Sequence, residues 1–195
     1  MSVLLVIFGI NGRQGTAVAH TFLNTPGWQV RGLTSSPHSQ ASDNWRARGV
    51  DIVEVDVNKE DCVKEAVVGA TAIFVVTDFY TQLADHSVQT LASLTSTPPE
   101  RHASNRDFQA GQNILRAAAN LPGLYRIVIS TLETTPATVR GQWQVDGKKK
   151  LVRELQDVFP QLLPRTSYVQ PCLPMEDFAT LLKKVVKLSW IPDNH

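Results

Sequence analysis

Residues 3–15 read VLLVIFGINGRQG, an apolar run that passes directly into three glycines spaced three apart. The run predicts a buried strand, and the residues from Gly12 onward have the apolar spacing of a helix. Because glycine has no Cβ, Gly9 allows a tight turn, Gly12 lets the backbone approach a pyrophosphate, and Gly15 lets the helix pack against the strand. This order of strand, turn and helix predicts a dinucleotide-binding loop, with an ordinary structural turn as the alternative.

The start of the expected helix adds to this prediction. A helix N-terminus presents N–H donors and the positive end of the helix dipole, both of which favour phosphate groups. Asn11, Arg13 and Gln14 fill the loop between the glycines, so we expect them at the cofactor as well. Dinucleotide is therefore the first expected partner of the chain.

The rest of the chain alternates short apolar runs with stretches of helical spacing. The expected strands are residues 3–8, 29–33, 51–55, 72–76 and 125–130. The expected helices are residues 12–23, 41–48, 59–68 and 105–120. Strands that alternate with helices predict an α/β fold, a doubly wound parallel sheet built from right-handed crossovers.

Later segments carry a weaker signal. Residues 80–103 are rich in Thr, Ser and Pro, and we expect a long surface excursion there. We expect a helix over residues 143–158 and a sixth strand over 165–170. Residues 176–190 have the pattern of an amphipathic helix, which we expect to pack on its own domain rather than on a membrane surface.

Composition limits the classes of function. The 195 residues carry 19 Lys+Arg and 18 Asp+Glu, so the formal charge of +1 offers no broad field for nucleic acid. Cys62 and Cys172 are too few for a disulfide framework and too far apart for a zinc site. We expect a cytoplasmic protein, or a nuclear one if it is regulatory, with no signal peptide and no membrane span.

The end of the second expected strand should indicate the choice of cofactor. An acidic residue roughly 20 positions beyond the glycine loop would bind the ribose 2′-hydroxyl of NAD. No acid is found there, and the nearest one, Asp43, lies in or near the next expected helix. The hydroxyls of Thr34, Ser35 and Ser36 could bind a 2′-phosphate, and Arg13 could add charge, unless the hydroxyls serve only turn chemistry. The pattern modestly favours NADP and leaves NAD open.

Several blocks in order resemble the NmrA-like family of atypical short-chain dehydrogenases/reductases, which is common in fungi. They cover nearly the whole chain, and the block at residues 74–79 is more family-specific than the glycines. The matching blocks are GINGRQG at 9–15, VRGLT at 30–34, GVDIVEVD at 49–56, GATAIFVVTDF at 69–79, ISTL at 129–132, DGK at 146–148 and MEDF at 175–178.

The resemblance implies a Rossmann domain at residues 1–160 and a remnant of a C-terminal substrate lobe at 161–195. It also implies that Asp56 lies near the adenine amino group, with a strand-end or helix-capping role as the alternative, and that Val57, Val76 and Thr77 contact the cofactor. Two departures matter. Ser35 stands where relatives commonly have a basic residue, and the chain stops soon after Phe178, so we expect a short or C-terminally truncated member.

A catalytic pair is harder to find. Ordinary short-chain dehydrogenases place Lys four residues after Tyr, but Ala84, Ile129 and Cys172 follow the three tyrosines at that spacing. By resemblance Lys148 occupies the lysine position and would hold the nicotinamide ribose, unless it is only a solvated cation. Gln144 then stands at the tyrosine position and, with the strand-end hydroxyl of Ser130, would orient an acceptor oxygen. If a phenol is required after all, Tyr80 and Tyr168 are the candidates.

Two functions therefore remain open. One is an NADPH-dependent oxidoreductase that acts on a small organic carbonyl or enone, with the cofactor supplying the hydride. The other is a non-catalytic dinucleotide sensor that acts through a regulatory protein partner. A metal site and a serine hydrolase are disfavoured, because the histidines are scattered and no Gly-x-Ser-x-Gly motif occurs.

Overall fold

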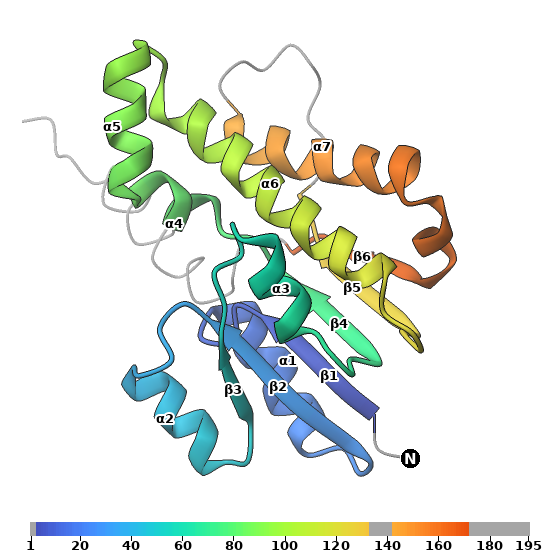
Figure 1. The fold of residues 1–195 in the computed structure, drawn as a ribbon. Helices are drawn as coiled ribbons and strands as arrows, with labels where there is room; N and C mark the ends of the chain where they lie inside the picture. Colours follow the sequence, from blue (N-terminus) through green and yellow to red (C-terminus); the bar gives the residue numbers. More distant parts are fainter. Residues whose placement is uncertain (1–2, 133–141, 172–195) are drawn as a thin grey trace, which may run out of the picture.

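A computed structural model describes residues 3–132 and 142–171 and shows one parallel sheet of six strands in the order β3-β2-β1-β4-β5-β6 (Figure 1). Both the α/β class and the doubly wound sheet are thus confirmed. The strand order reverses between β1 and β4, where chain connections leave in opposite directions. The strands are β1 (Val3–Phe8), β2 (Trp28–Thr34), β3 (Asp51–Glu54), β4 (Ala72–Val75), β5 (Arg126–Ser130) and β6 (Thr166–Val169).

Helices cover both faces of the sheet (Figure 1). Leu5 and Ile7 of β1 pack with Ala19 and Trp45, on the face of α1 and α2. Val6 and Phe8 point the other way and join the core formed with α3, α6 and α7. The helices are α1 (Arg13–Leu23), α2 (Gln40–Ala47), α3 (Glu60–Ala66), α4 (Phe79–Ala84), α5 (His86–Thr95), α6 (Pro99–Ala119) and α7 (Trp143–Val158), with a 3-10 helix at Pro160–Arg165.

Burial on both faces explains why the strands read as continuous apolar runs rather than alternating ones. The long helix α6 buries Gly111, Ile114, Leu115 and Ala118 on the face expected from the sequence. It lies beside α7 over the same half of the sheet (Figure 1).

The prediction of a long surface excursion over residues 80–103 is wrong. This segment forms most of α4, all of α5 and the start of α6, which begins at Pro99 rather than near residue 105. Two aspartates, whose capping role the sequence analysis did not predict, cap α4 and α5. Asp78 accepts from the N–H groups of Tyr80 and Thr81, and Asp85 accepts from the N–H of Ser87. Caps of this kind let a segment rich in Ser and Thr become helical.

The remaining expectations fall into two groups. The helix at 143–158 and the sixth strand are confirmed, and β6 belongs to the sheet although it follows residue 160. The division at residue 160 stays a prediction. The expected helix at 176–190, Cys172 and the family block at 175–178 lie outside the described residues. Within the described part of the chain, no helix has the length and apolar character needed to cross a bilayer.

Candidate functional site

The glycine loop joins β1 to α1 through close backbone contacts. Gly9 has a positive φ of 70°, and its carbonyl oxygen accepts from the N–H of Gly12 at 2.9 Å. A Cβ on Gly15 would lie 2.2 Å from that same carbonyl oxygen, so only glycine fits there. Gly12 is the N-cap of α1, and it has no side chain that could cap this helix end. The N-terminus of α1 therefore faces the loop with backbone donors, the arrangement that binds phosphate.

A pocket of about 170 Å³ opens beside this loop, between the carboxyl ends of β1 and β4. Ligands of open α/β sheets bind at this reversal of the strand order. Both apolar and polar residues line it. The lining includes Phe8, Gly9, Asn11, Gly12, Leu33, Thr34, Ser35, Val55, Val57, Val76, Thr77, Asp78, Thr81 and Gln82.

The end of β2 is tied to the glycine loop by side-chain hydrogen bonds. Asn11 Nδ2 donates to Thr34 Oγ1 at 3.2 Å and to Ser42 Oγ at 3.0 Å. Thr34 Oγ1 also accepts from the N–H of Ser36 at 3.1 Å, which is the turn chemistry anticipated as its alternative role. These bonds fix the loop that would meet the adenosine ribose.

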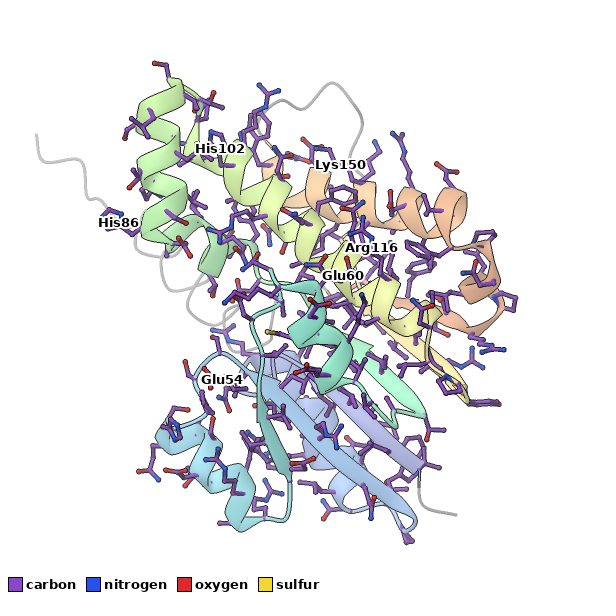
Figure 2. The ribbon with its side chains drawn as sticks, in the orientation of Figure 1. Glu54, Glu60, His86, His102, Arg116 and Lys150 are labelled. Carbon is purple, nitrogen blue, oxygen red and sulfur yellow. The ribbon has the colours of Figure 1, made fainter. Side chains whose placement is uncertain are left out.

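An acid that sequence reasoning missed lies next to this ribose position. Glu54, at the end of β3, is the register partner of Thr34 (Figure 2). Glu54, Asp56 and Asp85 line an adjoining cavity of about 270 Å³ together with Ser35 and Val57. Among the described residues that line the two cavities, none is basic. Only the pairing of β2 with β3 brings Glu54 beside Thr34, because 20 residues separate them in the chain.

Asp56 follows β3 and begins the turn into α3. Burial opposes its ionisation, but hydrogen bonds from Asn58 and the ammonium of Lys59 outweigh that effect and lower the pKa of Asp56. Its carboxylate accepts from the backbone N–H of Asn58 at 3.1 Å, a turn at the strand end rather than a helix cap, since the N-cap of α3 is Lys59. It is thus a partly exposed anion on the rim of the adjoining cavity.

Lys148 lies behind the end of β4 and is 7% exposed. The alternative interpretation of Lys148 as a solvated cation is therefore wrong. Its Nζ donates to the carbonyl oxygen of Thr77 at 3.0 Å and to Thr77 Oγ1 at 2.6 Å. Asp107 Oδ2 lies 3.4 Å from the same nitrogen. The ammonium therefore connects α7 to the strand end that lines the glycine-loop pocket.

Asp107, on α6, is the second functional candidate that sequence reasoning missed. It is 1% exposed, and burial raises its pKa, an effect that the Lys148 ammonium and the Thr77 hydroxyl only partly offset. Its Oδ1 and the hydroxyl of Ser104 are buried without a hydrogen-bond partner among the described residues. No spacing motif links residues 107 and 148, so only the packing of α6 on α7 shows the pair.

Gln144 precedes Lys148 by one helical turn and meets Tyr80. Tyr80 Oη donates to Gln144 Oε1 at 3.3 Å, which connects α4 to α7. Ser130 is 5% exposed at the end of β5 and, like Gln144, does not line the glycine-loop pocket.

The structure thus gathers most expected cofactor residues and separates others. Gly9, Asn11, Gly12, Thr34, Ser35, Val57, Val76 and Thr77 share one pocket, Asp56 lies in the adjoining cavity, and Arg13, Gln14 and Gly15 form the first turn of α1. Lys148 reaches this pocket through Thr77. Within residues 3–132 and 142–171, no group of His, Cys, Asp and Glu could hold a metal ion.

These residues fit a dinucleotide. A Cβ at Gly15 has no room, and the uncapped N-terminus of α1 suits a pyrophosphate. The hydroxyls of Thr34 and Ser35 suit a ribose, and the apolar lining residues, such as Val55 and Val76, suit a flat ring.

Comparison with known proteins agrees with this fit. The model of the NmrA-like family matches residues 1–184. One curated relative is the NmrA-like family domain-containing oxidoreductase FrzB of Cladobotryum sp., 28% identical over 133 residues, which are 67% of this chain and 34% of the relative. The chain thus spans about a third of the length of that relative.

Solved structures share the fold at low sequence identity. An NADPH-dependent quinone oxidoreductase of Escherichia coli, QOR2, complexed with NADPH, matches with a TM-score of 0.64 and 14% identity, covering 95% of this chain and 54% of that one. Nmra, a negative transcriptional regulator, matches with a TM-score of 0.61 and 14% identity, covering 87% of this chain and 45% of that one.

Proposed function

The chain belongs to the NmrA-like family, and we propose that it binds NAD(P)(H) and acts as an oxidoreductase on a small organic carbonyl or enone. One observation carries the proposal: the glycine loop, the N-terminus of α1 and the ends of β2 and β4 converge on one pocket. The curated relative is named an oxidoreductase, and QOR2 is complexed with NADPH, which supports the same reading. A bound reduced dinucleotide would supply the hydride.

We propose NADP(H) as the preferred cofactor by a small margin. The hydroxyls of Thr34 and Ser35 at the rim can donate to a 2′-phosphate. Glu54 beside them opposes a second negative charge, so the margin stays small.

The chain's own residues would divide the remaining work. Gly12 and the first turn of α1, including Arg13 and Gln14, would hold the pyrophosphate. Lys148 would fix Thr77 and, through it, the side of the site that takes the nicotinamide ribose. Gln144 and Ser130, near the ends of α7 and β5, would orient the acceptor oxygen.

A second candidate is a dinucleotide sensor that acts through a protein partner. It is favoured by the place of Gln144, one turn before Lys148, where a catalytic tyrosine would stand. The fold shared with a negative transcriptional regulator is consistent with it.

One assay separates the candidates. Purified chain is titrated with NADPH, and NADPH oxidation is then followed over a panel of carbonyls and enones. Binding with turnover supports the oxidoreductase, and binding without any turnover supports the sensor. Failure to bind NADP(H) or NAD(H) at millimolar concentration would contradict both.

A further inference from the structure

The proposed reduction requires a proton for the acceptor oxygen. Gln144 stands where a tyrosine would pair with Lys148, and a carboxamide cannot release a proton near neutral pH. The sequence contains three tyrosines. The donor must therefore be sought among groups that other elements bring to the first turn of α7.

Tyr80 is such a group. It lies in the first turn of α4, and its chain neighbours Asp78 and Thr81 line the glycine-loop pocket, although Tyr80 itself does not. Its Oη donates to Gln144 Oε1 at 3.3 Å, while Lys148 on the next turn of α7 binds Thr77. Tyr80 is 64% exposed, so its hydroxyl is open to a substrate. The phenol thus lies one hydrogen bond from the position that a helix tyrosine would occupy.

The other two phenols are placed differently. Tyr125 precedes β5, at the amino edge of the sheet and so at the opposite end from the pocket. Tyr168, on β6, lines a cavity beside Lys148 that shares no described lining residue with the glycine-loop pocket. Burial also raises the pKa of Tyr168, which makes it a weaker proton donor.

We propose that Tyr80 is the general acid of the reduction and that Gln144 is its positioning residue, an assignment that rests on the proposed oxidoreductase function. The carbonyl carbon takes a hydride from the reduced dinucleotide, and the carbonyl oxygen takes the proton of Tyr80 Oη. One C–H bond and one O–H bond form as a C–H bond of the reduced dinucleotide, the C=O π bond and the phenol O–H bond break, and the dinucleotide leaves in its oxidised form. The resulting phenolate regains its proton from water.

Gln144 suits the positioning role because its amide offers both kinds of partner. Its oxygen accepts from the phenol in this structure, and its NH₂ group carries two donors. Rotation of the amide would turn a donor toward the phenolate after transfer. In this arrangement a phenol from α4 takes the role of a tyrosine at position 144 of α7. The sequence analysis did not predict α4.

Kinetics provide the first test. Tyr80→Phe keeps the ring and removes the proton, so kcat on any substrate of the wild type should fall by about 10²- to 10⁴-fold. Its affinity for NADPH should stay within about twofold of wild type, since the ring that would lie beside the bound cofactor is kept and only the hydroxyl is removed. Tyr125→Phe and Tyr168→Phe are the matched controls and should retain kcat. Gln144→Ala should lower kcat less than Tyr80→Phe and change its pH profile.

Chemical modification provides a readout that needs no turnover. Tetranitromethane nitrates exposed phenols, and Tyr80 and Tyr125 are exposed to 64% and 70%. Saturating NADP⁺ should protect Tyr80 from nitration and leave Tyr125 reactive, as measured by mass spectrometry of peptides.

The outcomes test the role of Tyr80 separately from the proposed oxidoreductase function. Wild-type turnover that persists in Tyr80→Phe overturns the role of Tyr80 and leaves the oxidoreductase standing. Equal nitration of Tyr80 with and without bound NADP⁺ overturns it too. Absence of wild-type turnover on the whole panel contradicts the oxidoreductase and, with it, the general acid.

Discussion

Lys148 and Asp107 form a buried ion pair behind the end of β4, and such pairs are costly to break. Removing one partner leaves the other charge buried without compensation. We expect Lys148→Met to lower the free energy of unfolding by about 3 kcal/mol at neutral pH. Lys150→Met, which changes an exposed lysine of the same helix, is the control and should cost well under 1 kcal/mol (Figure 2).

The pH dependence of that loss identifies its cause. Burial raises the pKa of Asp107. The stability that this carboxyl group contributes is therefore fully present below its ordinary pKa and is lost as the pH rises through the raised pKa. Without the Lys148 ammonium the pKa rises further, and protonation relieves the buried charge. Urea denaturation should therefore show the cost of Lys148→Met shrinking as pH falls from neutral to mildly acidic. A cost independent of pH would contradict the pair.

Glu54 should limit the preference for NADP. A charge of this kind in a solvated site is worth about 1 kcal/mol, so Glu54→Gln should raise the affinity for NADP⁺ by roughly threefold to tenfold. The affinity for NAD⁺ should change by less. Asp61→Asn, on α3 with a side chain 93% exposed, controls for net charge. Calorimetry that finds equal changes for both cofactors would remove Glu54 from the account.

Glu54 and Lys148 also mark what the sequence could not supply at this scale. The glycine spacing placed Gly9, Gly12 and Gly15 correctly in the turn, because the signal is local. The pairing of Thr34 with Glu54 depends on strand register, and the burial of Lys148 depends on helix packing. Neither is encoded in the spacing of neighbouring residues.

Helices α4 and α5 depend on single aspartates at their N-termini. Asp85 accepts from the N–H of Ser87 and pairs with Arg106 of α6 at 3.2 Å. Asp85→Ala should cost about 1 kcal/mol and increase hydrogen exchange in α5 while leaving α7 unchanged. Ser93→Ala, on the exposed side of α5, should leave exchange near wild type. Unchanged exchange in Asp85→Ala would show that packing on α6 alone holds α5.

The failed expectation for residues 80–103 has the same origin. Apolar periodicity is weak there because α5 buries only Val88 and Ala92, while Leu91 and Leu94 are exposed among Ser, Thr and Gln. Polar contacts hold α5 instead. They are the Asp85 cap and a hydrogen bond at 3.0 Å between Thr95 and His102, a residue that Figure 2 labels. Elements with strong apolar faces, such as α6 and α7, were predictable over most of their length.

At the scale of the whole molecule, the alternation of strands and helices was enough to predict the parallel sheet. Right-handed crossovers restrict the order of strands, and both faces of β1 are buried, as its apolar run requires. The site forms where the order reverses, because there the ends of β1 and β4 diverge. The order of the strands thus determines where the pocket lies, and the individual residues determine what it can bind.

Titration of the chain with NADPH, with Gly12→Val beside wild type, tests the central claim of dinucleotide binding most directly. The backbone at Gly12 is extended, with φ −81°, and an added Cβ would lie 3.2 Å from the carbonyl oxygen of Gly9. Valine should therefore fit after a small local shift without unfolding the domain, and its side chain should block the pyrophosphate. Ala17→Val, on the exposed side of α1, is the matched control. We predict saturable binding by wild type and the control, and at least a tenfold loss in Gly12→Val, with a Tm lowered by no more than a few degrees. Wild-type affinity in Gly12→Val, or no binding by wild type at millimolar cofactor, would contradict the account.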